Sequence, residues 1–502
     1  MLRFNVYREG APVGSFDLTG SYMFGQDGIP IRSELLFQDG QFRCAKRGAG
    51  AAGLAVLWDA GGAGRILLPT CRLVDRDEPY CLNLELARAQ MMRIAQKRED
   101  WGLFDYGDAE SLNREFDDVR GRFIKAYQQS DQAKASILAD EAIEKGLLLG
   151  EKIVLYHAEV FISRRQALGV MKTAFGCAVN LGAADETSQR RLKDFDFVNI
   201  PLTWKLLEPK ERQYEFAPAD AWMTWATRSR KIVHAGPLLS FAPGQLPDWL
   251  FLWENDYASF KDMVYEHVQK VVKRYERQVH VWKVVSGLHA FNSFNLSFEQ
   301  LMELTRMTSL LVKKLTPHAQ VMVELLMPWS EYYARNPKTV PPLMYADMAV
   351  QSGVKFDSFG LNLCMGVPVD GLFVRDLLQI SSLFDEFLPF NKPLHVLAEV
   401  PSDVGEDGSD AWAGKIQVPQ AGHWHMSWSQ DLQASWAESV GRIVASKPFI
   451  ESLCWRDLAD YEDHFLPHGG LCDRNLDPKP AYERIITLKT KLASKPNKTS
   501  AK

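Results

Sequence analysis

The sequence predicts an α/β protein in which a TIM (β/α)8 barrel follows a small β-sandwich-like domain and a helical linker. After residue 170, eight apolar segments alternate with helical stretches over about 320 residues. This rhythm and length are typical of a closed parallel sheet with helical connections. The seventh segment, Leu394 to Val400, is uncharged except for Glu399. Such a run indicates a strand buried on both faces, with one carboxylate at its carboxyl end.

Residues 1–100 predict a β-rich N-terminal domain. Gly, Asp and Pro turns separate short strands expected at 2–8, 14–18, 31–37, 41–45, 53–58 and 65–74. This spacing is typical of a small sandwich. A helix is expected over 84–97. The domain could bind carbohydrate or serve as a structural cap on the next domain.

Residues 101–170 predict a helical linker, and residues 491–502 a disordered tail. Phe116, Val119, Phe123 and Tyr127 recur at helical spacing, but no heptad pattern is sustained. The tail is rich in Lys and poor in apolar residues, so it lacks the side chains to form a core.

Residues 171–490 predict the barrel. Its eight strands are expected at 173–179, 195–203, 231–240, 279–287, 319–326, 356–364, 394–400 and 450–457. No phosphate-binding glycine motif follows any of these segments, so nothing supports a nucleotide cofactor.

The composition of the chain limits which kinds of partner and which cellular compartment are expected. The net charge of -5 gives no electrostatic reason to expect nucleic acid. No apolar run is long enough to suggest a membrane span, and no signal peptide is recognised at the start. The seven scattered cysteines contain no CxxC pair, which argues against both a zinc site and a disulfide framework. We therefore expect a cytoplasmic protein without a metal or cofactor.

Polar and aromatic side chains gather at the carboxyl ends of the predicted strands. Hydroxyl, amide and indole groups that converge with carboxylates favour a sugar site over a phosphate or hydride site. We expect a carbohydrate ligand, either an oligosaccharide or a polysaccharide. The candidate ligand-binding residues are Asn199, Trp204, Gln245, Trp249, Ser286, His289, Asn362, Trp455 and Asp457.

Several segments, taken in order, resemble glycoside hydrolase family 10, the xylanase-type barrels. The strongest resemblance is at the end of the chain, where a Cys-Trp-Arg-Asp segment precedes a Pro-Lys-Pro-Ala-Tyr signature. The segments involved are 197–220, 236–249, 281–285, 356–362, 454–460 and 470–482. The resemblance covers roughly residues 172–490 and implies the barrel fold.

The resemblance also implies a chemistry, which the sequence only partly retains. Family members hydrolyse β-1,4-xylan with retention, using a nucleophilic Glu on the seventh strand and an acid/base Glu after the fourth. Glu399 stands at the nucleophile position, whereas Gly287 stands at the acid/base position. Our candidate replacement acid is Glu324, and His289 is a weaker one.

Two functional readings stay open, as does the role of Glu324. The protein could be a glycosidase that uses Glu399 and Glu324, including one that acts on small imported oligosaccharides. It could instead be a catalytically inactive barrel that binds a glycan or a protein. Glu324 could also be merely paired with Lys283 or Arg456, as charges in a barrel mouth often are.

Overall fold

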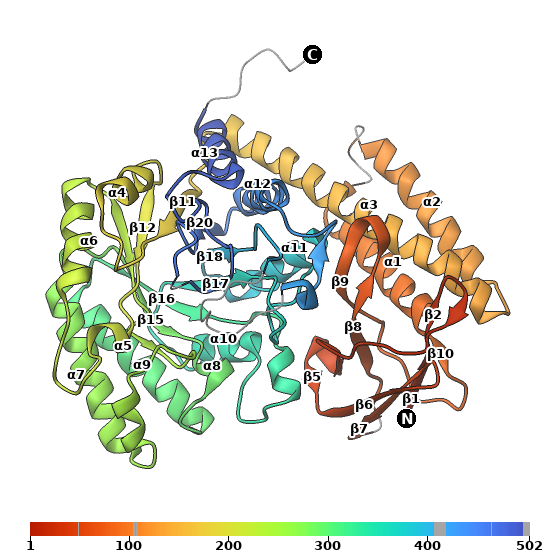
Figure 1. The fold of residues 1–502 in the computed structure, drawn as a ribbon, viewed down its shortest axis with the longest axis horizontal. Helices are drawn as coiled ribbons and strands as arrows, with labels where there is room; N and C mark the ends of the chain where they lie inside the picture. The colour runs from red at the N-terminus through yellow and green to blue at the C-terminus, as the bar shows by residue number, and fades with distance from the viewer. Residues whose placement is uncertain (49, 104–105, 107–108, 406–417, 463, 495–502) are drawn as a thin grey trace.

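The computed structural model describes residues 1–502 except 49, 104–105, 107–108, 406–417, 463 and 495–502. Its larger part is a closed barrel of eight parallel strands, which confirms the predicted fold (Figure 1). Pairing of β13 with β15 closes the ring. The barrel strands are β11 (Ala174–Ala178), β12 (Phe197–Ile200), β13 (Ile232–Ala235), β15 (Val281–Ser286), β16 (Gln320–Leu325), β17 (Ser358–Cys364), β18 (Leu394–Glu399) and β20 (Ile450–Trp455).

The third barrel strand differs from the continuous segment expected at 231–240. It is divided into β13 and a short β14 (Leu239–Ser240), which pairs with the upper part of β15. Gly236 and Pro237 separate the two pieces. Proline has no N–H to give to a ladder, and a Cβ at Gly236 would meet the Lys283 carbonyl oxygen at 2.4 Å. The break exposes this stretch of backbone to the mouth of the barrel.

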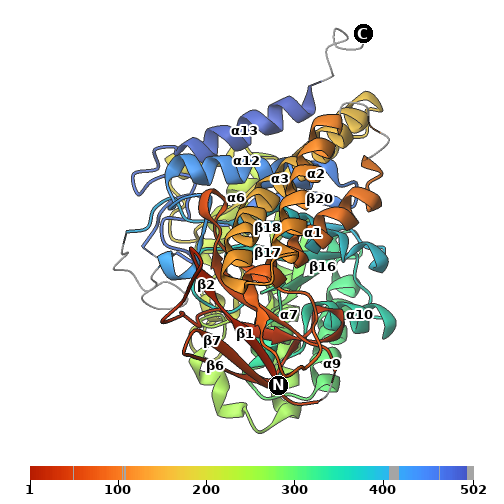
Figure 2. The ribbon, with the colours of Figure 1, turned by 90° about the vertical axis from the view of Figure 1, so that its right-hand side faces the viewer.

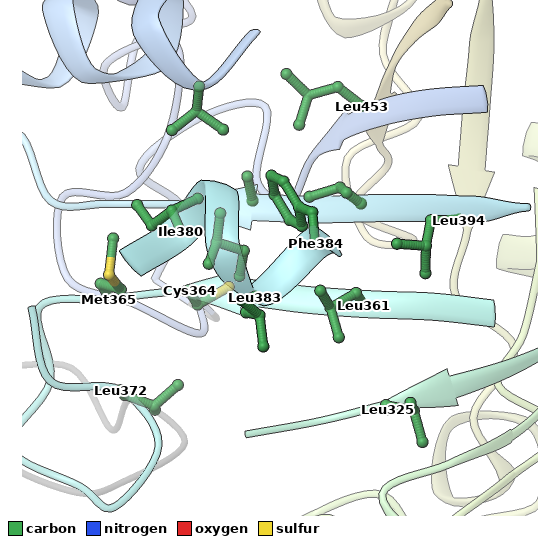
Figure 3. Packing of buried hydrophobic residues seen from close by; sticks show 14 of the residues in the cluster. Leu325, Leu361, Cys364, Met365, Leu372, Ile380, Leu383, Phe384, Leu394 and Leu453 are labelled. Carbon is green, nitrogen blue, oxygen red and sulfur yellow. The ribbon is translucent and has the colours of Figure 1, made fainter. Parts of the chain in front are cut away.

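Helices surround the barrel and bury their apolar faces on it. Figure 3 shows Ile380, Leu383 and Phe384 of α11 against the strands that carry Leu361 and Leu394, in one hydrophobic cluster. Every residue of β17 and β18 is buried, as expected for strands covered on both faces. The helices are α4 (Glu186–Leu192), α5 (Trp204–Leu207), α6 (Ala217–Arg228), α7 (Tyr257–Tyr275), α8 (Leu288–Phe291), α9 (Phe298–Leu315), α10 (Pro342–Gln351), α11 (Leu377–Asp385), α12 (Gln430–Ser446) and α13 (Pro480–Ala493).

The N-terminal β-rich region contains two main sheets and a small hairpin. The expected strand at 14–18 is not formed. Instead, the Phe16 ring packs against Phe42 in one sheet and Trp58 in the other, at centroid distances of 5.0 and 6.2 Å. The sheets are ordered β10-β1-β7-β6 and β19-β9-β8-β4-β5. Their N-terminal strands, with the hairpin β2–β3, are β1 (Leu2–Asn5), β2 (Tyr7–Arg8), β3 (Ala11–Pro12), β4 (Tyr22–Phe24), β5 (Pro30–Ile31), β6 (Ser33–Gln38), β7 (Gln41–Lys46), β8 (Gly53–Asp59), β9 (Gly64–Pro69) and β10 (Tyr80–Cys81).

Three helices connect this region to the barrel. They are α1 (Leu82–Asp100), α2 (Glu110–Tyr127) and α3 (Gln132–Ala167). At 36 residues, α3 is about 54 Å long and reaches from the N-terminal sheets to the barrel helix α12 (Figures 1 and 2). Within the described ranges, no helix combines the length and apolarity needed to cross a bilayer.

One strand of the N-terminal sheets comes from the barrel. β19 (His423–Trp424) lies in the connection after β18 and pairs antiparallel with β9. Glu151 of α3 holds the same connection, because it accepts hydrogen bonds from Trp424 Nε1 and from His425 Nε2, the latter at 2.8 Å. The N-terminal sheets are therefore joined to the loops of the barrel's carboxyl face.

The β9–β19 pairing predicts that Gly64→Ala destabilises the protein. Gly64 has φ +101°, and a Cβ there would meet the His423 carbonyl oxygen at 2.3 Å. We expect a loss of about 2 kcal/mol or more in the free energy of unfolding, measured with urea. Gly14→Ala is the matched control, because a Cβ at Gly14 meets nothing within 4 Å. Equal stability of the two variants would contradict the pairing.

Candidate active site

The mouth of the barrel contains a cavity of about 170 Å³ at the carboxyl ends of the strands. Its walls combine apolar side chains with amides, hydroxyls and two pairs of opposite charges. The lining residues are Ala178, Val179, Asn199, Pro201, Thr203, Leu206, Gly236, Pro237, Ser240, Ala242, Gln245, Lys283, Ser286, Glu324, Leu326, Met327, Asn362, Leu372, Leu397, Arg456, Asp457 and Phe465.

Two amides face this cavity with unused hydrogen-bonding capacity. Asn199 at the end of β12 and Asn362 near the end of β17 are both buried, and the Oδ1 of each has no hydrogen-bond partner. Unpaired buried acceptors are costly, so they favour a ligand that donates O–H or N–H groups. In the described chain, no cluster of three or more His, Cys, Asp or Glu side chains is arranged to hold a metal ion.

Glu324 is the acidic side chain deepest in the cavity. Its Oε1 lies 3.2 Å from Lys283 Nζ, and its Oε2 accepts a 2.6 Å hydrogen bond from Ser286 Oγ. Both carboxylate oxygens are therefore engaged by neighbouring side chains. Of the two partners that the sequence suggests, the structure places Lys283 within ion-pair distance.

Glu399 does not line the cavity. Its relative exposure is 0%, because residues 464–470, which we call the strap, cross over the end of β18. Gly469 of the strap lies directly on the carboxyl group, and a Cβ at Gly469 would meet Glu399 Oε1 at 2.3 Å. The Gly469 backbone thus covers the Glu399 carboxyl group and separates it from solvent.

The strap is held in place by hydrogen bonds from three side chains below it. Trp455 Nε1 donates to the Gly469 carbonyl oxygen at 2.9 Å. Gln433 Nε2 donates to the same oxygen at 3.1 Å and to the Val400 carbonyl oxygen at 2.9 Å. Lys479 of the Pro-Lys-Pro-Ala-Tyr signature pairs with Asp460, whose Oδ1 accepts from the Gly470 N–H. These bonds fix the cover over Glu399.

Burial determines the protonation of Glu399. Loss of hydration, followed by the nearby Asp457 carboxylate, raises the pKa of the Glu399 carboxyl well above its usual range, and the Arg456 guanidinium only partly opposes this. Neither carboxyl oxygen has a hydrogen-bond partner within the described residues. A covered carboxyl group with a raised pKa is a poor nucleophile.

Glu324 and Glu399 also stand at offset positions in the strand register. On the intervening strand β17, Glu324 is paired with Gly360 and Glu399 with Cys364. Four residues along a strand correspond to about 13 Å. A retaining pair of carboxyls needs a separation of about 5 to 5.5 Å and an inverting pair about 6.5 to 9.5 Å. The strand register gives no support to such a pair.

Gly287 follows β15 in a left-handed turn with φ +64°. A Cβ at this position would meet Leu326 Cδ1 at 2.6 Å, so the space is already filled. The backbone here therefore disfavours any side chain, and an acid at this position would require the turn to change.

Besides Glu399, four of the sequence-predicted residues lie outside the cavity lining. Trp204 donates from Nε1 to Glu208 at 2.8 Å and stacks on His267, and Trp249 donates to the Glu208 carbonyl oxygen. Trp455 supports the strap. His289 is fully buried and bonded to the Leu326 carbonyl oxygen, and burial lowers its pKa to about 4. The structure does bring Asn199, Gln245, Ser286, Glu324, Asn362 and Asp457 together around the cavity.

Sequence reasoning missed the positive charges of the cavity as ligand groups. Lys283 occupies an inward position of β15, and Arg456 follows β20 directly. Strand alternation could have identified Lys283. The apolar walls from Leu206, Leu372 and Phe465 come from connecting segments, for which the sequence carried no signal.

The barrel is similar in sequence to known glycosyl hydrolases. The model of glycosyl hydrolase family 10 matches residues 166–304. The chain is 23% identical to endo-1,4-beta-xylanase B of Thermotoga neapolitana over 298 residues, covering 57% of this chain and 78% of the relative. It is 26% identical to the endo-1,4-beta-xylanase/feruloyl esterase of Xylanibacter ruminicola over 338 residues, which cover 62% of this chain and 44% of that relative. The crystal structure of xylanase 10B from Thermotoga maritima has a TM-score of 0.46 at 17% identity and covers 66% of this chain and 98% of that one. The protein contains a divergent family 10-like barrel.

The covered Glu399 predicts an unusual pH dependence for Glu399→Gln. A folded-state pKa above the unfolded value means that the native state holds an extra proton, so this contribution to stability is present at low pH and is lost as pH rises. Glu399→Gln carries no ionisable group at this position, so it does not lose this stability as pH rises. We expect the variant's stability relative to the parent protein to rise by at least about 1 kcal/mol between pH 5 and pH 8, measured by urea unfolding.

Glu215→Gln is the matched control, because Glu215 is exposed. Its stability relative to the parent protein should not change over the same pH range. A Glu399→Gln variant whose stability relative to the parent protein does not change between pH 5 and pH 8 would show that the carboxylate is already ionised in the folded protein at pH 5.

Proposed function

We propose that the barrel mouth binds a short β-linked saccharide and does not hydrolyse it by the retaining mechanism of family 10. The observation that carries the proposal is the position of Glu399 at the end of β18, fully buried under Gly469. The cavity beside it stays open and is lined by groups suited to hydroxyls.

Two lines of support favour a saccharide. The relatives of the barrel are named as xylanases, whose ligands are β-linked sugars. The cavity offers unpaired amide oxygens at Asn199 and Asn362 beside the apolar surfaces of Pro237 and Leu326. Its volume lies below the range of about 300–1,000 Å³ that is usual for larger ligands, which favours one or two sugar rings.

Three features weigh against retaining hydrolysis. Glu399 is covered, and burial raises its pKa. Gly287 stands where the family has its acid, in a turn without room for a side chain. Glu324 is engaged by Lys283 and Ser286. Loss of a general acid alone normally reduces a rate by about 10²- to 10⁴-fold.

One observation favours a hydrolase as the second candidate function. Glu324 faces the cavity, so it could donate a proton to a glycosidic oxygen if Lys283 moved away. This mechanism would also require the strap to leave Glu399.

Binding and turnover can be measured separately. Titration calorimetry with xylobiose, cellobiose and their monosaccharides should detect binding to the purified protein, while aryl β-xylosides and β-glucosides should yield no product. Asn362→Ala should weaken binding by about tenfold, because a buried acceptor for a ligand hydroxyl is lost. Asn255→Ala, at an exposed site outside the cavity, is the matched control.

Two results would overturn the proposal. The first is turnover of any glycoside that Glu399→Gln abolishes, which would establish the hydrolase. The second is an absence of binding by every saccharide tested, which would leave the cavity without a sugar ligand.

A further inference from the structure

The Arg456 guanidinium lines the cavity and forms no direct ion pair with a described residue. Its carbon lies 3.9 Å from the centroid of the Phe465 ring, which leaves the edge of the guanidinium group available. Among the described residues, no carboxylate lies within ion-pair distance of it and its side chain donates no hydrogen bond. An arginine has five N–H donors in a fixed plane, so this position carries a large unused donor capacity.

The described carboxylates near Arg456 act on it from a distance, and none of them pairs with it directly. Lys283 and Glu324 form their own pair at 3.2 Å. Asp457 accepts the backbone N–H of Phe465 and does not reach the guanidinium group within ion-pair distance. Glu399, on the adjacent strand, is covered and lies outside the cavity.

We propose that the saccharide bound here carries a carboxylate, as a uronic acid does, and that Arg456 binds this carboxylate through two parallel hydrogen bonds. The inference rests on the proposed function and names the class of its ligand. A planar carboxylate matches the guanidinium fork in shape and charge. The unpaired amide oxygens of Asn199 and Asn362 would accept hydrogen bonds from the ring hydroxyls.

The charge balance favours a single negative charge. Asp457 and Glu324 also line the cavity and would repel a dianion such as a sugar phosphate more strongly than a monoanion. A neutral sugar would leave the half-buried Arg456 without a direct ion pair among the described residues.

The test compares two ligands that differ only at C6. Methyl β-D-glucuronide and methyl β-D-glucoside are titrated into the full-length protein by calorimetry. We expect the glucuronide to bind about 10- to 100-fold more tightly. Arg456→Gln should remove this preference. Arg456→Lys should retain part of the preference, because it keeps the charge and loses the fork.

Controls separate folding from binding. Thermal unfolding of each variant checks that the barrel is intact, and the Arg456→Lys protein keeps the test decisive if Arg456→Gln fails to fold. Lys205→Gln is the matched control, because Lys205 is half exposed, pairs with Asp248 and lies outside the cavity lining. It should leave the preference unchanged.

The outcomes are distinguishable. Equal affinities for the glucuronide and the glucoside would overturn the proposal that the ligand carries a carboxylate. The proposed saccharide-binding function would still hold. Tighter binding of glucose 6-phosphate than of the glucuronide would overturn the choice of a monoanion. Absence of binding by both methyl glycosides and by the neutral disaccharides would overturn the proposed function as well.

Discussion

The contact between the Gly469 backbone and the Glu399 carboxyl group determines the character of the whole mouth. It requires a glycine in the strap, a protonated carboxyl group beneath it, and the anchoring bonds from Gln433 and Lys479 that hold the two together. That contact covers the end of β18, while the open cavity is lined by residues of most barrel strands, including Ala178 of β11 and Leu397 of β18. The cavity presents amides, two cations and the carboxyl groups of Glu324 and Asp457, and Glu399 is not among its lining residues.

The same face of the barrel is tied to the N-terminal sheets. β19 extends the sheet that contains β9, and the backbone N–H of Leu67 in β9 donates to the Val374 carbonyl oxygen in the connection after β17. Leu372 of that connection is a wall of the cavity. The N-terminal region therefore contacts the connection that carries this cavity wall.

The sequence was a good guide to the barrel because its strands are long, apolar and buried on both faces. Its motifs are also structural in part: Lys479 anchors the strap, and Tyr482 of the same signature donates a hydrogen bond to Asp194 at 2.7 Å. The site was harder to predict because strand-end position does not show whether a side chain is covered. Trp204 and Trp455 were expected to hold sugar, yet their indoles bond to Glu208 and Gly469. Those contacts depend on loops, whose sequences lack the hydrophobic periodicity that predicts helices and strands.

The proposed function depends most on the inability of Glu399 to attack a sugar. Covalent trapping tests this inability directly. A fluorinated aryl β-xyloside forms a stable glycosyl–enzyme ester with a working retaining nucleophile, and intact-protein mass spectrometry detects the added mass. If Glu399 cannot attack, the mass of the intact protein stays unchanged after prolonged incubation. An adduct located on Glu399 by peptide mapping would contradict it.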